Sequence, residues 1–359
     1  MTQTSEKTYM WIIKVYLEPT FKCNLHCKFC YVGEMQEQHT KQHVFEEQDI
    51  EQLKKNIDTV FLEEGNPTYD IDILWWEPNL NKNLNFIISY ISRQYHTRRF
   101  TITSNATLYT QQKIQELQAS WITEFRVSLH WLEQTHNSLV WSDVFSRVLE
   151  SIRYLKDAKI AYTLIYVINQ KNLEDILPLL DLLAGKDILP GGIFFEFVEF
   201  SGYALQHIQD LNIIYTKEVT QKLNSVFTEI WKIYPSVGMA FTNIPKCVLD
   251  TQFHKEIDDS IWDKERYEMY IPNVVRKSFF GFTSLEERAL VKSNLKKGYK
   301  INFQSKIDPV YIPEACNTCE FNKWCYLLRK ETILFEYLWE EFLKRKHYFE
   351  INKKISPWK

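Results

Sequence analysis

The stretch Cys23–Cys30 reads Cys-Asn-Leu-His-Cys-Lys-Phe-Cys and places three cysteines on one short loop in a Cys-x3-Cys-x2-Cys pattern. It closely follows an apolar run, Trp11–Leu17, that predicts a β-strand. Three thiolates at this spacing can hold three irons of a [4Fe–4S] cluster, because soft sulfur ligands favour such clusters over hard cations. The fourth iron is then open to a substrate or cofactor. Zinc is the alternative, with His26 as fourth ligand, but the position of His26 inside the loop suits tetrahedral closure poorly.

Around this loop, short β-like runs alternate with helical patterns. The predicted strands are Trp11–Leu17, Ile71–Trp75, Phe100–Thr103, Phe125–Leu129, Tyr162–Ile168 and Ile193–Phe200. The predicted helices between them are Val44–Glu63, Leu84–Tyr95, Gln111–Gln118, Val144–Lys156 and Leu173–Leu183. Six βα units are too few for a closed eight-stranded barrel, so the sequence predicts an α/β fold, a partial (β/α)6 TIM-like barrel with parallel strands. Site residues of such sheets gather at the carboxyl ends of the strands.

The composition of the 359 residues excludes several classes of protein. Hydrophobic residues make up 45% and charged residues 25%, as in ordinary globular proteins. The net charge of −3 argues against a dedicated nucleic-acid binder. No apolar run reaches the roughly 18–20 residues that span a bilayer, and Met1–Tyr9 is too polar for a secretory signal. We therefore expect a cytoplasmic protein without a nucleic-acid or membrane partner.

The seven cysteines are an odd number, which argues against a disulfide framework and for metal or redox chemistry. A second group, Cys316, Cys319 and Cys325, has the pattern Cys-x2-Cys-x5-Cys, and Cys247 stands alone. Together these four thiolates fit either a zinc ion or a fully ligated [4Fe–4S] cluster. Alternatively, Cys247 stays free near the cavity and donates a hydrogen atom to the substrate.

The pattern changes after about Gly202, which suggests a second domain. Val219–Trp231 looks helical, Gly238–Thr242 is β-like, and a helix is expected from about Glu331 to Arg345. We expect a barrel domain at residues 10–205, a small cysteine-rich domain with the C-terminal helix at residues 206–345, and a basic tail at residues 346–359.

The spacing of Cys23, Cys27 and Cys30, with aromatic Phe29 before the last cysteine and a strand before the loop, resembles the radical S-adenosylmethionine (SAM) superfamily. The resemblance covers roughly Trp11–Gly202. It implies that the open iron binds the amino and carboxylate groups of SAM. It also implies that an electron from the cluster cleaves SAM to a 5′-deoxyadenosyl radical, which abstracts a hydrogen atom from the substrate.

Other residues match SAM-contacting positions of that family. Trp75-Trp76-Glu77-Pro78 stands where the family usually has Gly-Gly-Glu-Pro, which implies that Glu77 binds the SAM amino group. The alternatives are a simple surface carboxylate for Glu77, turn chemistry for Asn105 and a polar rim for the last residues of the set. Glu199 lies on the opposite face of its strand from Glu196, so we expect only one of them in the cavity. The implied cofactor-binding residues are Phe29, Glu77, Ser104, Asn105, Ser128, Asn169 and Glu196.

The second cysteine group resembles the SPASM and twitch auxiliary-cluster domains of radical SAM enzymes. A full SPASM domain continues with a further cysteine pair, but position 329 is Arg329, so the resemblance implies one auxiliary [4Fe–4S] cluster and is closer to twitch. Such a cluster can accept or supply an electron, which suits net oxidation of the substrate.

The resemblance implies an oxidative modification, such as a cross-link, a dehydrogenation or a backbone cleavage, of a ribosomally synthesised peptide. Only 22 residues precede Cys23, so we expect a separate leader-binding protein to deliver the peptide. A reductant such as flavodoxin or ferredoxin is the other expected partner. Two alternatives stay open: dehydrogenation of a small molecule, and a non-catalytic Fe–S protein in which Trp75-Trp76 marks a lost SAM site.

Overall fold

The computed structural model describes the first part of the chain in most detail. The described residues are 12–17, 19–20, 22–30, 33, 50–51, 54, 57–58, 68–74, 76–169, 171–198, 203–207, 211, 217–242, 248–256 and 274–279. Several predictions fall outside these residues: the roles of Cys247, Cys316, Cys319 and Cys325, the positions of Trp75 and Glu199, the helix Glu331–Arg345 and the basic tail.

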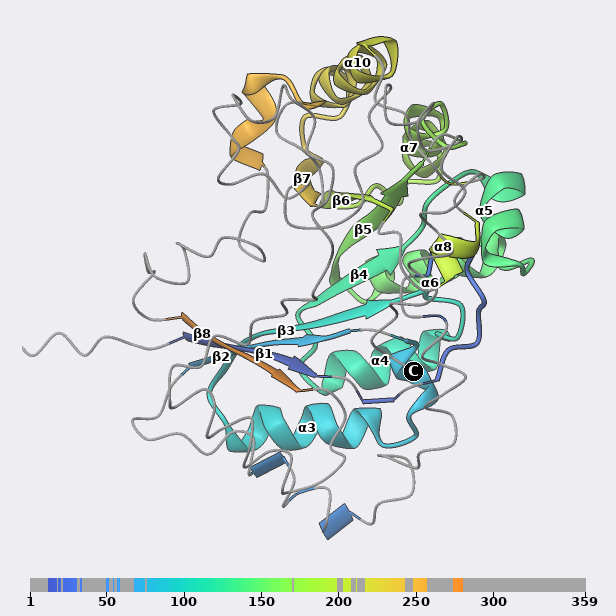
Figure 1. Ribbon diagram of the computed structural model, residues 1–359. Helices are drawn as coiled ribbons and strands as arrows, with labels where there is room; N and C mark the ends of the chain where they lie inside the picture. Colours follow the sequence, from blue (N-terminus) through green and yellow to red (C-terminus); the bar gives the residue numbers. More distant parts are fainter. Residues whose placement is uncertain are drawn as a thin grey trace, which may run out of the picture.

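The strands of the described residues form one parallel sheet of eight strands in the order β7-β6-β5-β4-β3-β2-β1-β8. They are β1 (Ile12–Leu17), β2 (Thr68–Ile73), β3 (Thr97–Ser104), β4 (Glu124–Ser128), β5 (Ala161–Ile168), β6 (Gly192–Phe197), β7 (Gly238–Thr242) and β8 (Val274–Phe279). Figure 1 shows the sheet curling from β1 and β8 up to β7. In the described part of the chain, β7 and β8 are its two edges and do not pair with each other, which confirms an open, partial barrel.

Helices cover the convex side of the sheet, with α3, α7 and α10 outside it in Figure 1. The helical elements are η1 (Pro78–Leu80), α3 (Leu84–Gln94), α4 (Gln111–Ala119), α5 (Glu133–Val140), α6 (Phe145–Asp157), α7 (Ile176–Gly185), α8 (Tyr203–Gln206), α10 (Lys217–Ile233) and η3 (Thr251–Glu256). Val148, Ile152 and Leu155 of α6 recur at helical spacing and are buried in the same apolar core as the strands. Sequence periodicity therefore predicted the buried face of α6.

All six predicted strands of the barrel are present, but β2 lies earlier than expected. It begins at Thr68 rather than Ile71 and ends at Ile73. Thr68–Asp70 was missed because Asp70 is polar, although it is buried. Asp70 forms an ion pair with Arg98 in the neighbouring strand β3, and the pairing allows a charged residue inside a sheet.

Two strands extend the sheet beyond the six that the βα pattern predicts. β7 was predicted as a β-like run, and it pairs with β6. β8 was not predicted, and it pairs in parallel with β1. Both lie beyond residue 205, where we expect the second domain to begin, so the sheet draws strands from that interval. The position of the domain boundary stays a prediction.

The helices agree only in part with the sequence predictions. α5 was not predicted from the sequence, and it lies between β4 and α6. Of the predicted helix Val44–Glu63, residues 50, 51, 54, 57 and 58 are described and are helical. Among the described helices, none has the length and apolarity that a membrane crossing requires.

An aromatic group holds β7 and α10 on the sheet. The ring of Phe227 in α10 lies 4.9 Å from that of Phe195 in β6, 4.8 Å from that of Phe241 in β7 and 5.9 Å from that of Phe253 in η3, measured between ring centroids. All four rings are fully buried. Phe227 therefore joins three elements that are distant in the sequence.

We expect Phe227→Ala to lower the free energy of unfolding by about 3–5 kcal/mol, because it leaves a cavity among three other rings. Ile233→Ala is the control in the same helix: Ile233 is 56% exposed, and its truncation should change stability by less than about 0.5 kcal/mol. Denaturant unfolding of the full chain, followed by circular dichroism, measures both. Equal losses for the two variants would contradict the packing of α10 against β7.

Candidate functional site

The loop that carries the first three cysteines leaves the carboxyl end of β1 and is fastened to the segment after β2. The N–H of Glu77 donates to the carbonyl of Lys22 at 2.9 Å. The buried Asn81 donates from Nδ2 to the carbonyl of Pro19 at 2.6 Å. These bonds hold the start of the loop at the carboxyl edge of the sheet, where sites of parallel sheets lie.

The far end of this loop is fastened to two helices. The N–H of Lys28 donates to the carbonyl of Leu139 in α5 at 2.9 Å, and the N–H of Tyr203 in α8 donates to the carbonyl of Cys30 at 2.9 Å. Within the loop, the N–H of Cys30 donates to the carbonyl of Cys27 at 3.0 Å. The cysteine backbone is thus tied to elements more than one hundred residues away.

The three thiols are half-buried, and none of them forms a disulfide. Burial raises the pKa of Cys23 to about 12. Burial, followed by the charges of Cys30 and Cys23, raises the pKa of Cys27 well above its usual range. The thiolates are therefore close enough to repel one another, and a cationic metal centre would reverse this effect because thiolate is the form that binds metal. The donor set fits such a centre.

Zinc and a [4Fe–4S] cluster make different demands on this loop. Zinc requires its ligands to converge on one ion, whereas the cysteines of a [4Fe–4S] cluster each bind a different iron. His26, the fourth ligand of the zinc alternative, is exposed. Among the described residues, no group of three or more His, Cys, Asp or Glu side chains is arranged to hold a single metal ion. The choice between the two metal centres stays a prediction from the cysteine spacing.

Glu77, just after β2, is fully buried and lies against the loop that follows β3. Its Oε2 accepts hydrogen bonds from Ser104 Oγ at 2.7 Å and from the N–H of Asn105 at 3.1 Å, and its Oε1 accepts from the N–H of Asn79 at 3.2 Å. Burial raises the pKa of Glu77 to about 7, and the hydrogen bonds oppose the rise. The alternative of a simple surface carboxylate is wrong, because Glu77 connects two loops at the carboxyl edge.

Trp76, directly before Glu77, has a backbone conformation that suits glycine. Its φ angle is 56°, which lies in the left-handed region that glycine adopts without steric cost. This conformation accounts for the glycine that is usual at this position in the family that the motif resembles. A residue with a Cβ pays about 1–2 kcal/mol for this conformation. The backbone turn is therefore present with an indole in place of a hydrogen atom.

Asn105 connects the β3 loop to the cysteines. Its Nδ2 donates to Asn24 Oδ1 at 3.0 Å and lies 3.8 Å from Cys23 Sγ. Its Oδ1 accepts from the N–H of Thr107 at 3.0 Å, so turn chemistry accounts for part of its role. The sequence-predicted residues Glu77 and Asn105 therefore meet Cys23 at one edge.

Phe29 packs against residues that follow β4. Its ring centroid lies 4.6 Å from that of His130 and 5.2 Å from that of Trp131, both in edge-on geometry. His130 Nδ1 accepts a hydrogen bond from the N–H of Val167 in β5 at 3.0 Å, and burial lowers the pKa of His130 well below its usual range. Sequence reasoning did not select His130 or Trp131, although their place directly after a strand was the available signal.

The other predicted residues lie at the ends of later strands. Asn169, after β5, is fully buried; its Oδ1 accepts from the N–H of Lys171 at 2.9 Å, and its Nδ2 has no partner among the described residues. Ser128 and Glu196 are half-buried and face the concave side, because the residues next to them in β4 and β6 belong to the apolar core. The fold thus brings the whole described set to the carboxyl edge.

Comparison with known proteins agrees with this geometry. The profile of the Radical SAM superfamily matches residues 17–183, the range from the end of β1 to α7. No curated protein sequence matches the chain.

Solved structures share the fold, and three of them illustrate the likeness. SuiB from Streptococcus suis, bound to S-adenosylmethionine, has 16% sequence identity and a TM-score of 0.56, over 90% of this chain and 75% of SuiB. The same protein bound to the precursor peptide SuiA has 16% identity and a TM-score of 0.51, over 76% of this chain and 58% of that one. The structure of anSMEcpe with bound AdoMet and the Cp18Cys peptide has 12% identity and a TM-score of 0.55, over 88% of both chains. At these identities the likeness concerns the fold.

His136 in α5 packs against His130, which in turn contacts Phe29. The rings of His136 and His130 are stacked with centroids 6.2 Å apart. It is buried, and within the described residues neither ring nitrogen has a hydrogen-bond partner. Burial lowers the pKa of His136 from 6.5 to about 4, so the folded protein keeps this imidazole neutral.

This shift predicts a loss of stability in acid. The unfolded chain protonates His136 first as the pH falls from 6.5 to 4, so His136 costs the folded state up to about 3 kcal/mol over that interval. We expect His136→Leu to remove this part of the pH dependence. Unfolding free energies of both proteins at several pH values measure it, and a difference between them that does not change with pH would contradict the burial of a neutral imidazole.

Proposed function

Residues 17–183 of this chain belong to the radical SAM superfamily, and from this premise we propose that the protein reductively cleaves S-adenosylmethionine and oxidatively modifies a ribosomally synthesised peptide. The observation that carries the proposal is the three-cysteine loop at the carboxyl edge of the sheet. The [4Fe–4S] cluster, when bound, supplies one electron to the SAM sulfonium, which yields methionine and a 5′-deoxyadenosyl radical that takes a hydrogen atom from the substrate.

The chain's own residues hold and orient the reactants. Cys23, Cys27 and Cys30 would ligate the cluster through three irons, which leaves one iron for SAM. Glu77 and Asn105 fix the neighbouring loops against Cys23 through the hydrogen bonds described above. This support keeps SAM and substrate in one geometry, and a radical enzyme depends on such positioning.

On this proposal, the implied SAM contacts lie at or after the carboxyl ends of six strands, β1 to β6. Phe29 lies in the cysteine loop, and Ser128 and Glu196 are half-buried on the concave side. Glu77 and Ser104 are fully buried and bonded to each other, so they support the SAM site by fixing its edge. A carboxylate has about four acceptor positions, and Glu77 uses three of them in the described structure. Contact between Glu77 and the amino group of SAM, which the motif implies, would therefore require that this fully buried carboxylate become accessible.

A second cluster is part of the proposal. Cys247, Cys316, Cys319 and Cys325 would supply four thiolates to one auxiliary [4Fe–4S] cluster of the twitch type. A fully ligated cluster can take up the electron that the substrate radical loses, so the net reaction is a two-electron oxidation with SAM as one acceptor. If Cys247 is not a ligand, it would instead donate a hydrogen atom to the substrate radical.

The peptide substrate is supported by the fold neighbours. SuiB is bound to its precursor peptide SuiA in one structure, and anSMEcpe is bound to the Cp18Cys peptide in another. We propose that a separate leader-binding protein delivers the peptide and that a flavodoxin or ferredoxin in the cytoplasm supplies the electron. A short precursor gene beside the gene of this protein would favour the peptide over a small alcohol or sugar.

Cys27→Ala should abolish 5′-deoxyadenosine formation, because two thiolates cannot hold the cluster. The assay uses anaerobically reconstituted protein with SAM and dithionite, and chromatography detects 5′-deoxyadenosine. His26→Ala is the matched control: it lies in the same loop, is exposed and should retain activity. Equal activity of Cys27→Ala and the wild type would contradict the role of this loop, and no activity in the wild type would favour a non-catalytic Fe–S protein.

Cys319→Ala should separate SAM cleavage from product formation. We expect 5′-deoxyadenosine formation to persist in part, because the first loop is intact, while modification of the peptide fails for lack of an electron acceptor. Mass spectrometry of the peptide measures the second effect. An unchanged yield of modified peptide would mean that the second cysteine group is only structural.

A further inference from the structure

A row of polar side chains crosses the concave face of the sheet, opposite the helices. Phe100 and Ile102 of β3 belong to the apolar core, so Thr101 between them faces the concave side. Thr101 pairs with Asp72 of β2 on one side and with Glu124 of β4 on the other. The three side chains therefore lie in one row across adjacent strands.

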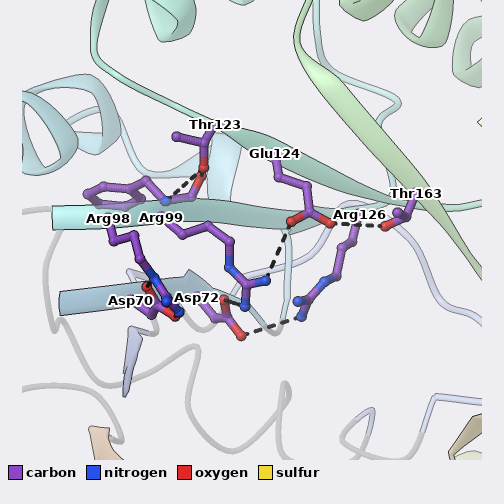
Figure 2. A network of polar contacts seen from close by, with 9 residues as sticks. Asp70, Asp72, Arg98, Arg99, Thr123, Glu124, Arg126 and Thr163 are labelled. Atoms are coloured by element: carbon purple, nitrogen blue, oxygen red, sulfur yellow. Dashed lines mark hydrogen bonds and ion pairs between the residues drawn. The ribbon is translucent and has the colours of Figure 1, made fainter. Parts of the chain in front are cut away.

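Two arginines, Arg99 and Arg126, lie beside the carboxylates of Asp72 and Glu124, as Figure 2 shows. Arg126 Nη1 donates to Asp72 Oδ2 at 3.4 Å. Arg99 makes longer ion pairs, 3.9 Å to Asp72 Oδ1 and 3.9 Å to Glu124 Oε2. Ion pairs at 3.9 Å are beyond hydrogen-bond distance, so the two guanidinium groups are held near their partners without using most of their donors.

The arginines have more donors than the described residues satisfy. A guanidinium carries five N–H donors and no acceptor. The Nε atoms of Arg99 and Arg126 are buried and have no hydrogen-bond partner among the described residues. The hydroxyl of Thr101, whose side chain is fully buried, also lacks a partner there. The side chains of Arg99 and Arg126 as a whole stay 37% and 17% exposed, so a ligand would reach their Nη donors. Their surplus of donors over acceptors favours a ligand that accepts several hydrogen bonds.

Arg126 is placed to meet a substrate. It precedes Ser128 by two residues on the same face of β4, so it lies about 7 Å deeper in the barrel than the expected SAM contact. Its guanidinium carbon lies 5.1 Å from the ring centroid of Phe194 in β6, which holds the planar group by a cation–π contact. A substrate group that extends past Ser128 therefore meets Arg126.

We propose that Arg126, supported by Arg99 and Thr101, binds a carboxylate of the substrate. The inference rests on the proposed function, because it takes the interior of the barrel as the substrate site. A carboxylate only accepts hydrogen bonds, and its two oxygens match the fork of a guanidinium. Asp72 orients Arg126 from the other side. In a peptide the carboxylate belongs either to an acidic side chain or to the C-terminus.

Binding of four hexapeptides, all blocked at the N-terminus, tests the site. In the first pair the C-termini are amidated, and the central residue is Glu in one peptide and Gln in the other. In the second pair the two peptides share one neutral sequence, and the C-terminus is free in one and amidated in the other. Calorimetric titration of the anaerobically reconstituted full chain with SAM gives the affinities. At least one carboxylate peptide should bind about tenfold more tightly than its amide twin, and the pair that differs identifies the source of the carboxylate. No preference in either pair would overturn the proposal.

Variants locate the preference. Arg126→Met should remove the tenfold difference, whereas Arg98→Met should keep it, because Arg98 pairs with Asp70 and its side chain is 57% exposed. If Arg126→Met does not fold, Arg126→Lys decides: it keeps the charge but loses the fork, and the preference should fall to about threefold or less. A full preference in the variant that folds would overturn the proposal.

The experiment distinguishes failure of this inference from failure of the proposed function. The titrations require no turnover, and 5′-deoxyadenosine formation by the wild type is measured separately. Formation of 5′-deoxyadenosine without a carboxylate preference would refute the Arg126 site and leave the SAM chemistry standing. A carboxylate preference without formation of 5′-deoxyadenosine would support the Arg126 site and refute the SAM chemistry.

Discussion

Bringing three thiols together in a half-buried loop has an electrostatic cost, and the surrounding structure depends on meeting it. Burial and mutual repulsion both disfavour the thiolate of Cys27. Backbone hydrogen bonds with α5 and α8, together with the bond from Glu77 to Lys22, fix the loop at both ends. The fold thus holds the three cysteines at the carboxyl edge of the sheet, and a bound metal centre would favour their thiolate form.

The same sheet carries two different environments on its two faces. The convex face is apolar and packs against the helices, as β/α folds require. The concave face carries paired charges such as Asp72 and Arg126. Charged residues buried on a sheet are costly unless they are paired. In these pairs some guanidinium N–H donors of Arg99 and Arg126 have no acceptor among the described residues. This surplus is more easily explained by a substrate than by stability, because an apolar interior would serve stability as well.

Much of this arrangement could be predicted from the sequence. The apolar periodicity located the six strands of the barrel, and the cysteine spacing located the site. The start of β2 was missed because Asp70 looks like a loop residue until its ion pair with Arg98 of β3 is known. His130 and His136 were missed because a buried histidine has no local sequence pattern. Their positions follow only from the tertiary packing, in which the ring of His130 contacts those of Phe29 and His136. β8 lies far from its neighbour β1 in the sequence, and pairing over such a distance leaves no local signal.

The iron and acid-labile sulfide content of the anaerobically purified chain tests the central claim most directly. A three-thiolate cluster at Cys23–Cys30, together with one auxiliary cluster, predicts about eight iron and eight sulfide per chain. About four of each would support the first cluster alone. A colourless protein that contains zinc and no sulfide would contradict the account, because the open iron on which SAM binding depends would not exist.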